Sequence, residues 1–239
     1  MSAPRKIGIL GGMGPEATVL LQQRLIARMS GGDDADHIPL IIDMNPQVPS
    51  RIAHLIEKTG EDPGPVLAEM ARRLEQAGAE ALAMPCNTAH HYAEQIGEAT
   101  ELPLLHMVDL SAETAFNRVG EGGCVGILAS PAVQMTGLFD KAFSRMGITT
   151  RWPEDADLML SAIRLIKANG PCKEAEEILF EASRELLSQG AQLQLVACSE
   201  YSMIADSTGL EANVIDTLDV LVAAIIDFSF NIPVQELQQ

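Results

Sequence analysis

The sequence has few basic residues for its size. It contains 16 Lys and Arg against 33 Asp and Glu, which gives a formal net charge of −17 at pH 7. Nucleic acid and anionic membrane surfaces would be repelled, because no local stripe of basic residues interrupts this acidity. A small anionic substrate is not excluded, since two or three cations placed in a pocket outweigh a distant surface charge that salt screens. A pocket for such a substrate must therefore contain cations.

Long apolar runs and closely spaced cysteine pairs are also missing. No stretch is long and apolar enough to span a bilayer, and the opening MSAPRKIGILGG lacks the apolar core of a signal peptide. We therefore expect a cytoplasmic protein. Because a reducing cytoplasm disfavours disulfides, each cysteine is expected to be a catalytic or a buried thiol. None of them shows CxxC spacing; they are Cys86, Cys124, Cys172 and Cys198.

What the sequence does have is a regular alternation of strand-like apolar runs and amphipathic helical stretches. KIGILGG, IPLIIDMN and GCVGILAS are of the first kind, and PEATVLLQQRLIARMS and TGLFDKAFSRMG are of the second. This alternation is typical of βαβ units, in which helices cover a parallel sheet. With 239 residues, 47% of them hydrophobic, the chain has enough apolar side chains for a packed core. We predict an α/β fold.

The chain also repeats itself. Residues 66–86 and 178–198 align without a gap from an amphipathic helix through a Gly-Ala turn to a cysteine, and IGILGG (7–12) resembles VGILAS (125–130). Helix–turn–strand units resemble one another through shared packing demands, but the matched cysteines favour a duplication. We therefore predict two pseudo-symmetric, Rossmann-like, three-layer domains with parallel sheets and an active site in the cleft between them.

The expected boundary lies near HMVDLS (106–111). The final apolar stretch, NVIDTLDVLVAAIIDFSF, is expected to form a helix that returns to the first domain. The first domain would then comprise residues 1–108 and 213–239, and the second would comprise residues 109–212.

Cys86 and Cys198 end the repeated strands. Because parallel strands present their carboxyl ends to ligands, the two thiols are expected to converge on the cleft. A thiolate is a competent base as well as a nucleophile, so two thiols on opposite faces of a planar carbanion can divide the work. One removes a proton and the other returns one to the opposite face. Such a pair predicts a racemase or an epimerase.

The residues that follow each cysteine suit this chemistry. At a helix start, free backbone N–H groups and the positive end of the dipole bind a carboxylate and favour a thiolate. A carboxylate held there also takes up charge when the α-proton leaves. The side chains expected at these two places are Asn87, Thr88, Ser199 and Glu200.

Other uses of the same motifs stay open. Cys86, His90 and His91 form only an incomplete zinc-ligand set, so no metal is expected. Cys124 and Cys172 are interpreted as buried structural thiols. The second interpretation makes Cys124 and Cys172 part of the core rather than of the active site.

The loop GGMGPEA (11–17) loosely fits a dinucleotide fingerprint, although Pro15 and the lack of a strand before the aspartates at 33–36 are poor matches. A backbone nest for a small anion fits the loop better. Arg51 and Lys167 are either solvated surface charges or the cations that an anionic substrate requires.

Taken together, these segments resemble the PLP-independent aspartate/glutamate racemase family over most of the chain. GILGGMGPEAT is similar to the family's N-terminal loop, NPQVPSR to its substrate-loop segment and MPCNTAH to its first catalytic motif. IKANG is similar to the segment that carries its lysine, and ACSEYS to its second cysteine motif. The specific part of the likeness is PCNTAH together with GGMGP.

The resemblance implies two α/β domains, no cofactor, a small anionic amino-acid substrate and a homodimer. It carries Cys86 and Cys198 over as the acid/base pair. Arg51 and Lys167 carry over as cations that bind a carboxylate or tune a thiolate. The further pocket residues that it implies, besides those that follow each cysteine, are Met13, Gly14, Asn45 and Gln47.

Three segments depart from the family's pattern. ASPAVQMTG has Ala132 and Val133 where members often carry a Gly-Thr pair, and Ser130 and Thr136 are expected to replace a lost carboxylate or amine contact. DTLDVL (216–221) lacks the histidine that often follows the Asp-Thr pair. The second cysteine motif has Ala-Cys-Ser-Glu in place of Gly-Cys-Thr-Glu, which keeps the hydroxyl. Racemisation stays the prediction, and the substrate side chain stays open.

The predicted function is racemisation of an amino acid, aspartate or glutamate, by a two-cysteine acid/base mechanism at Cα. The alternatives are a hydantoin racemase or maleate isomerase type of reaction, and a non-catalytic amino-acid-binding protein. A nucleotide-binding enzyme is a further alternative, based on the glycine-rich loop alone.

Overall fold

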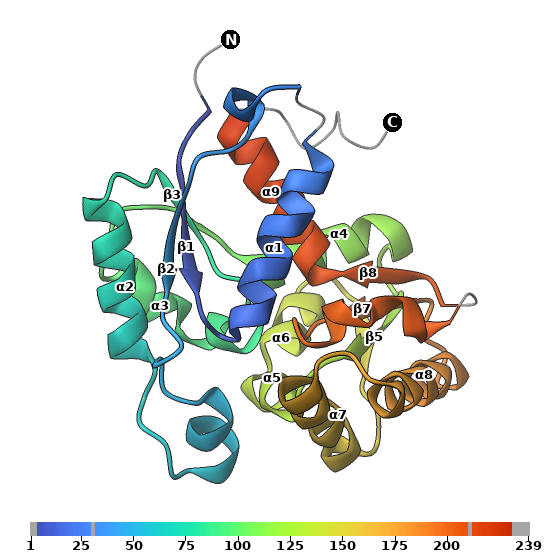
Figure 1. Ribbon diagram of the computed structural model, residues 1–239. Helices are drawn as coiled ribbons and strands as arrows, with labels where there is room; N and C mark the ends of the chain where they lie inside the picture. Colours follow the sequence, from blue (N-terminus) through green and yellow to red (C-terminus); the bar gives the residue numbers. More distant parts are fainter. Residues whose placement is uncertain (1–3, 30–31, 210–211, 231–239) are drawn as a thin grey trace.

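Two parallel sheets of four strands each organise the protein (Figure 1). The computed structural model describes residues 4–29, 32–209 and 212–230. The sheets have the orders β2-β1-β3-β4 and β6-β5-β7-β8, so the same connectivity occurs twice, and the predicted duplicated α/β fold is confirmed. The strands are β1 (Ile7–Gly11), β2 (Leu40–Met44), β3 (Ala81–Ala83), β4 (Leu104–Leu105), β5 (Cys124–Leu128), β6 (Thr149–Arg151), β7 (Leu193–Val196) and β8 (Val214–Asp216).

Helices cover both faces of each sheet. In β1, Ile7 and Ile9 face one layer and Leu10 faces the other, because side chains alternate along a strand. On the first sheet, the layers are α1 (Pro15–Arg28) with α9 (Thr217–Phe230), and α2 (Gly64–Gln76) with α3 (Ala93–Gly97). On the second sheet, they are α4 (Met107–Val119) with α5 (Pro131–Thr136) and α6 (Leu138–Ser144), and α7 (Ala156–Asn169) with α8 (Lys173–Ser188).

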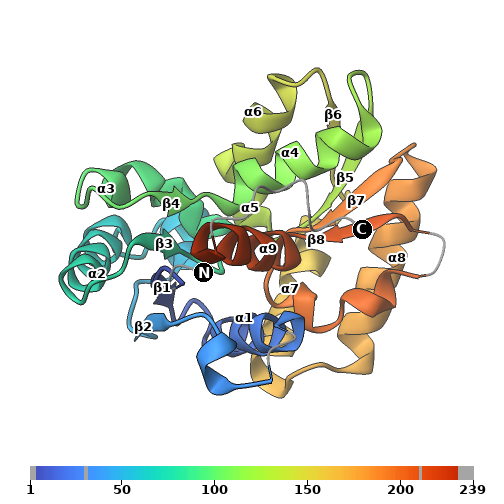
Figure 2. The ribbon, with the colours of Figure 1, turned by 90° about the horizontal axis from the view of Figure 1, so that it is seen from above.

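The two halves exchange a helix. Helix α4 follows β4 of the first sheet but packs through Val108 and Ala112 on the second sheet. Helix α9 follows β8 of the second sheet but packs through Leu218 and Leu221 on the first, as predicted for the last helix. The two exchanged helices also contact each other, and Figure 2 shows α9 running between the two halves. The expected boundary between residues 108 and 109 places most of α4 in the second domain, whose sheet this helix covers.

This exchange bears on the expected domain limits. Strand β8 falls within residues 213–239, which were expected in the first domain, yet it pairs with β7 of the second sheet. Of the expected domains, residues 1–3, 30–31, 210–211 and 231–239 lie outside the described part of the chain. Among the described helices, none is both long enough and apolar enough to cross a membrane.

A long connection between β2 and α2 brings a further segment to the junction of the halves (Figure 1). It contains a single π-helical turn, Ala53–Glu57, which contacts α5 of the second half. Glu57 also pairs with Arg164 of α7 at 3.5 Å. The connection therefore spans both halves and carries residues 50–52 over the space between them.

The loop before α1 is held against β2 at one glycine. Gly12 has φ +92°, and a Cβ there would lie 2.4 Å from the Asn45 carbonyl carbon, so only glycine fits. The Gly12 N–H donates to Thr18 Oγ1 at 3.0 Å. These contacts fix the loop that places Met13 at the junction of the halves.

Candidate active site

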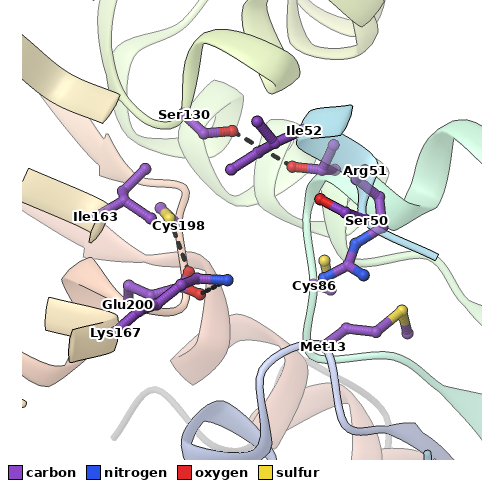
Figure 3. A pocket seen from close by; sticks show the side chains of 11 residues that line it. Met13, Ser50, Arg51, Ile52, Cys86, Ser130, Ile163, Lys167, Cys198 and Glu200 are labelled. Atoms are coloured by element: carbon purple, nitrogen blue, oxygen red, sulfur yellow. Dashed lines mark hydrogen bonds and ion pairs between the residues drawn. The ribbon is translucent and has the colours of Figure 1, made fainter. Parts of the chain in front are cut away.

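A pocket lies between the two halves, and both contribute to it (Figure 3). Its cavity of about 50 Å³ has room for a few water molecules. The first half provides Met13, Ser50, Arg51, Ile52, Cys86 and Thr88, and the second half provides Ser130, Ile163, Lys167, Cys198 and Glu200.

Cys86 and Cys198 reach this pocket from equivalent turns. Cys86 follows β3 and Cys198 follows β7, and each is a free thiol with 7% of its surface exposed. The residue four positions after each cysteine holds the cysteine's own carbonyl: His90 Nδ1 lies 2.9 Å from the Cys86 oxygen, and the Ser202 N–H donates to the Cys198 oxygen at 3.0 Å. The sequence repeat is thus also a repeat of local hydrogen bonding.

The helices expected after the two cysteines are short. A 3₁₀ turn, Thr88–Tyr92, precedes α3 in the first half, and a 3₁₀ turn of three residues, Tyr201–Met203, follows Cys198. Backbone N–H groups of Glu200 and Tyr201 nevertheless act to lower the pKa of Cys198, against the larger effects of burial and of the Glu200 carboxylate. The short turn after Cys198 therefore favours a thiolate to some extent without a long helix behind it.

A carboxylate and a cation flank Cys198 (Figure 3). Its thiol donates to Glu200 Oε2 at 3.1 Å, and Lys167 Nζ lies 3.0 Å from Glu200 Oε1. Burial raises the pKa of Cys198 well above its ordinary value, and the Glu200 charge and hydrogen bond raise it further. Burial lowers the pKa of Lys167, but the charge and hydrogen bond of Glu200 outweigh it and leave that pKa raised. Cys198 is thus held as the neutral thiol.

The groups around Cys86 differ in charge from those around Cys198. Arg51 points into the pocket from the long β2–α2 connection, and its Nη1 donates to the Pro49 carbonyl at 3.1 Å. Within the described chain, no carboxylate forms an ion pair with Arg51. The hydroxyls of Thr88 and Ser130 meet across the junction at 3.4 Å. An unpaired guanidinium and two hydroxyls therefore face the space beside Cys86.

His90 belongs to the structure of the turn. It is 1% exposed; its Nε2 accepts from the Met107 N–H at 3.1 Å, so its Nδ1 carries the proton and donates to the Cys86 carbonyl. Burial lowers the pKa of His90 to about 3, with His106 adding to the effect, so the ring is neutral near pH 7. Both nitrogens are occupied, and His91 is exposed. Over residues 4–29, 32–209 and 212–230, no three His, Cys, Asp or Glu side chains are grouped to hold a metal ion.

Cys124 and Cys172 are not as buried as predicted. Both are half-buried thiols. Cys124 is the first residue of β5, and Cys172 is the N-cap of α8. Each therefore lies at the end of an element, at the border between the core and the solvent.

Eight residues of the predicted site line the pocket together, but six do not. The Asn87 amide donates to Thr217 Oγ1 at 2.9 Å, and the Thr136 hydroxyl donates to the Val133 carbonyl at 2.6 Å. Asn45 Oδ1 accepts from the backbone of Gln47 at 3.0 Å. The residues outside the lining are Gly14, Asn45, Gln47, Asn87, Thr136 and Ser199.

Three residues that line the pocket were not predicted from the sequence. Ser50 and Ile52 flank Arg51, and Ile163 precedes Lys167 by four positions on α7. Residues four apart share one face of a helix, so that spacing is a signal that could have identified Ile163. With Met13, the two isoleucines form an apolar part of the wall.

Comparison with known proteins gives a consistent result. The family model described as Asp/Glu/Hydantoin racemase matches residues 10–225. The broad specificity amino-acid racemase RacX of Bacillus subtilis (strain 168) is 24% identical over 218 residues, which are 88% of this chain and 92% of that protein.

Solved structures agree in fold. Picrophilus torridus aspartate racemase superposes with a TM-score of 0.85 and 28% identity, covering 95% of this chain and 94% of that one. Glutamate racemase from Francisella tularensis, solved with D-glutamate, has a TM-score of 0.66 and 16% identity over 99% of this chain and 85% of its own. At the latter identity the likeness concerns the fold alone.

Proposed function

The chain belongs to the Asp/Glu/hydantoin racemase family, and from this premise we propose that it inverts Cα of aspartate or glutamate without a cofactor. The observation that carries the proposal is the pair of buried thiols, Cys86 and Cys198, that reach one pocket from equivalent turns of the two halves. Inversion needs a base on one face of the substrate and an acid on the other, and this pair can supply both.

The two cysteines would act in sequence. The thiolate of one takes the proton from Cα, and the electron pair of the broken C–H bond is delocalised into the substrate's α-carboxylate. The thiol of the other then gives its proton to the opposite face, which forms the new C–H bond and leaves that sulfur as a thiolate. Each turnover therefore exchanges the protonation states of the two cysteines, which suits a reaction that must run in both directions.

The charges around the pocket favour an acidic amino acid. Arg51 is available for a carboxylate, and Lys167 is neutralised in part by Glu200. A guanidinium binds a carboxylate through two parallel hydrogen bonds, and such charge-assisted bonds strengthen as negative charge builds up on the carboxylate. We assign Arg51 to the α-carboxylate, and we assign Thr88 and Ser130 to the polar groups at the substrate's other end.

The hydrogen bond to Glu200 decides which cysteine starts as the acid. Cys198 holds its proton against Glu200 Oε2 at 3.1 Å. We therefore propose that Cys198 is the resting acid and that Cys86, beside Arg51, is the resting base.

The test is racemisation in D₂O by the purified protein. We expect L-aspartate or L-glutamate to lose optical activity while deuterium enters Cα, measured by circular dichroism and mass spectrometry. Cys86→Ala and Cys198→Ala should each abolish inversion, whereas Cys124→Ala, which removes a thiol outside the pocket, should retain it. Normal inversion by both active-site variants would overturn the two-thiol mechanism.

Two further experiments test the proposed absence of a cofactor and the proposed substrate. Hydroxylamine, which traps PLP, and EDTA should leave the rate unchanged if no cofactor takes part. Hydantoins, maleate and neutral amino acids complete the substrate panel, because Met13, Ile52 and Ile163 give the wall an apolar part. Binding of aspartate without deuterium exchange would favour a non-catalytic binding protein instead.

A homodimer and a cytoplasmic location also belong to the proposal. Both follow from the family resemblance and from the composition of the chain. Light scattering on the purified protein tests the first, and fractionation of the native cells tests the second.

A further inference from the structure

Asp216, the last residue of β8, connects to the Cys198 turn. Its Oδ1 accepts from the Ser202 hydroxyl at 2.8 Å and from the Leu218 N–H at 2.9 Å. Ser202 in turn donates its N–H to the Cys198 carbonyl at 3.0 Å. A single side chain thus links the start of the exchanged helix α9 to the turn that carries the second thiol.

Thr217, the next residue, connects to the Cys86 turn. Its Oγ1 accepts from the Asn87 side-chain amide at 2.9 Å and donates to the Val196 carbonyl at 3.0 Å. Asn87 follows Cys86 directly, and Val196 is the last residue of β7. Thr217 therefore bonds to the first half through one lone pair and to the second half through its proton.

Arg24 of α1 adds a third connection. Its Nη1 lies 2.6 Å from Asp216 Oδ2, and its Nη2 donates to the Ser202 carbonyl at 2.7 Å. Helix α1, which covers the first sheet, thus contacts the Cys198 turn through Arg24.

Arg24 is half-buried, the other groups are buried, and none of them lines the pocket. Asp216, Thr217 and Asn87 are 8%, 1% and 2% exposed. A buried carboxylate is costly unless it is paired, and Arg24 and Ser202 satisfy this one. Asn87 Oδ1 has no hydrogen-bond partner among the described residues, but the other bonds given above are made, and a buried network of this kind can fix the relative placement of the segments that it joins.

We propose that Arg24, Asn87, Ser202, Asp216 and Thr217, together the inter-domain clasp, are positioning residues that hold the Cys86 turn and the Cys198 turn in register for proton transfer. The inference rests on the proposed function for its kinetic part only. It is specific, because the Arg24–Asp216–Ser202 branch acts on Cys198 and the Thr217–Asn87 branch acts on Cys86. Misplacement of reacting groups by about 1 Å costs a rate factor on the order of 100.

The first experiment needs no activity. Iodoacetamide labelling of the full chain, quantified at each cysteine by peptide mass spectrometry across pH, reports the thiolate of each turn, with Cys124 and Cys172 as internal references. Arg24→Gln should release the Cys198 turn toward solvent and raise the labelling rate of Cys198 at pH 8 by about tenfold, while Cys86 is unchanged. Arg28→Gln is the matched control, because Arg28 lies on the same helix and, among the described residues, pairs with Asp219 at 3.4 Å but not with Asp216; Arg24 also contacts Asp219, at 3.3 Å.

The other branch has its own variants. Asn87→Ala should change the labelling rate of Cys86 and leave that of Cys198 as it is. Thr217→Val removes both hydroxyl bonds, to Asn87 and to the Val196 carbonyl, at nearly constant volume, so it should change the labelling rate of Cys86 at least as much as Asn87→Ala does. Thr217→Ser keeps the hydroxyl and should behave as the unaltered protein.

The second experiment is kinetic. Aspartate or glutamate deuterated at Cα, used as each enantiomer in turn, gives the primary isotope effect in both directions. Thr217→Val and Arg24→Gln should lower kcat by about tenfold or more and raise the isotope effect, because a misplaced thiol slows the proton-transfer step itself. A loss of folded protein would lower the apparent kcat but would change neither the isotope effect nor KM.

The outcomes separate the two proposals. Wild-type labelling profiles and isotope effects in folded Arg24→Gln and Thr217→Val protein would overturn the clasp as a positioning device, whatever the activity. Altered labelling of the predicted cysteine in a chain that racemises no amino acid would support the clasp and overturn the proposed function. Equal labelling changes at all four cysteines would also overturn the clasp, since they indicate general loosening.

Discussion

The two cysteine turns share one construction and differ in charge. In each, the residue four positions after the cysteine holds the cysteine carbonyl and contacts the start of an exchanged helix, through His90 and Met107 in one half and through Ser202 and Asp216 in the other. In the first half, a neutral imidazole ring connects the cysteine turn to the exchanged helix, and in the second half a network that includes an ion pair connects them. The two turns therefore have similar geometry but are stabilised by different kinds of interaction.

The positions two residues after the cysteines differ more consequentially. Thr88 follows Cys86 at that spacing, and Glu200 follows Cys198. Only the second brings a carboxylate to the thiol, with Lys167 behind it. Under the proposed mechanism, a symmetric reaction does not require a symmetric resting site, because it requires only that one proton be available on one side of the substrate.

The largest expected effect comes from removing each thiol in turn. Cys86→Ala and Cys198→Ala should each lower kcat for inversion by a factor on the order of 1,000 or more, since the acid or the base is lost. Each variant keeps one base and should still exchange the α-proton of one enantiomer with D₂O, the opposite enantiomer in the two cases. NMR of each enantiomer in D₂O measures this. Exchange of the same enantiomer by both variants would contradict the arrangement on opposite faces.

The next effect separates the two cations. Arg51→Gln should raise KM by about 10- to 100-fold, because a hydrogen bond to a charged group contributes about 1.5–3 kcal/mol. Lys167→Gln should change KM less, since Glu200 already compensates the lysine. Initial rates over substrate concentration test both. Arg72→Gln, which removes a surface arginine paired with Glu69 on α2, is the control and should leave KM unchanged.

A smaller effect should follow from removing the carboxylate beside Cys198, which makes the two cysteine turns more alike in charge. Glu200→Gln removes the carboxylate that adds to burial in raising the pKa of Cys198, so that pKa should fall. We expect iodoacetamide to label Cys198 faster at pH 8, and we expect kcat to drop by about tenfold because the acid is no longer held protonated. Glu177→Gln breaks an exposed lysine–glutamate pair and serves as the control. An unchanged labelling rate would show that Glu200 does not govern the thiol.

The smallest effect concerns stability in acid. His90 is neutral in the folded state because its pKa is lowered to about 3, whereas in the unfolded chain it titrates near 6.5. Its contribution to stability is therefore complete above pH 6.5 and is lost as the pH falls toward 3, by about 1.4 kcal/mol for each pH unit. Urea unfolding at pH 7.0 and 5.5 should show a weaker pH dependence in His90→Gln. In His91→Gln, which alters the exposed neighbour, the dependence should match that of the unaltered chain.

Much of the fold could be predicted because its signals are local. The alternation of apolar runs and the repeat ending in Cys86 and Cys198 indicate two parallel sheets and equivalent strand ends. Strand β8 was not predicted, because the continuous apolar run over residues 213–230 indicates a single helix as long as its pairing with β7 is unknown.

The site shows the same limit. Met13, Arg51 and Lys167 were predicted from chemistry and motif, and they line the pocket. Asn87 adjoins Cys86 in sequence, yet the start of the 3₁₀ turn directs its amide to Thr217, the first residue of α9 and distant in the sequence. Contacts between segments so far apart in the sequence cannot be predicted from the residue pattern within either segment.

The exchanged helices have a consequence for the history and folding of the chain. Cut between α4 and β5, the first half would lose α9 and expose Ile7 and Ile9, and the second half would lose α4 and expose Val125 and Ile127. Neither half is then a self-sufficient folding unit, despite the repeat. We expect one cooperative unfolding transition for the whole chain, and we expect an ancestral half to have been stable only as a dimer that swapped this helix between its subunits.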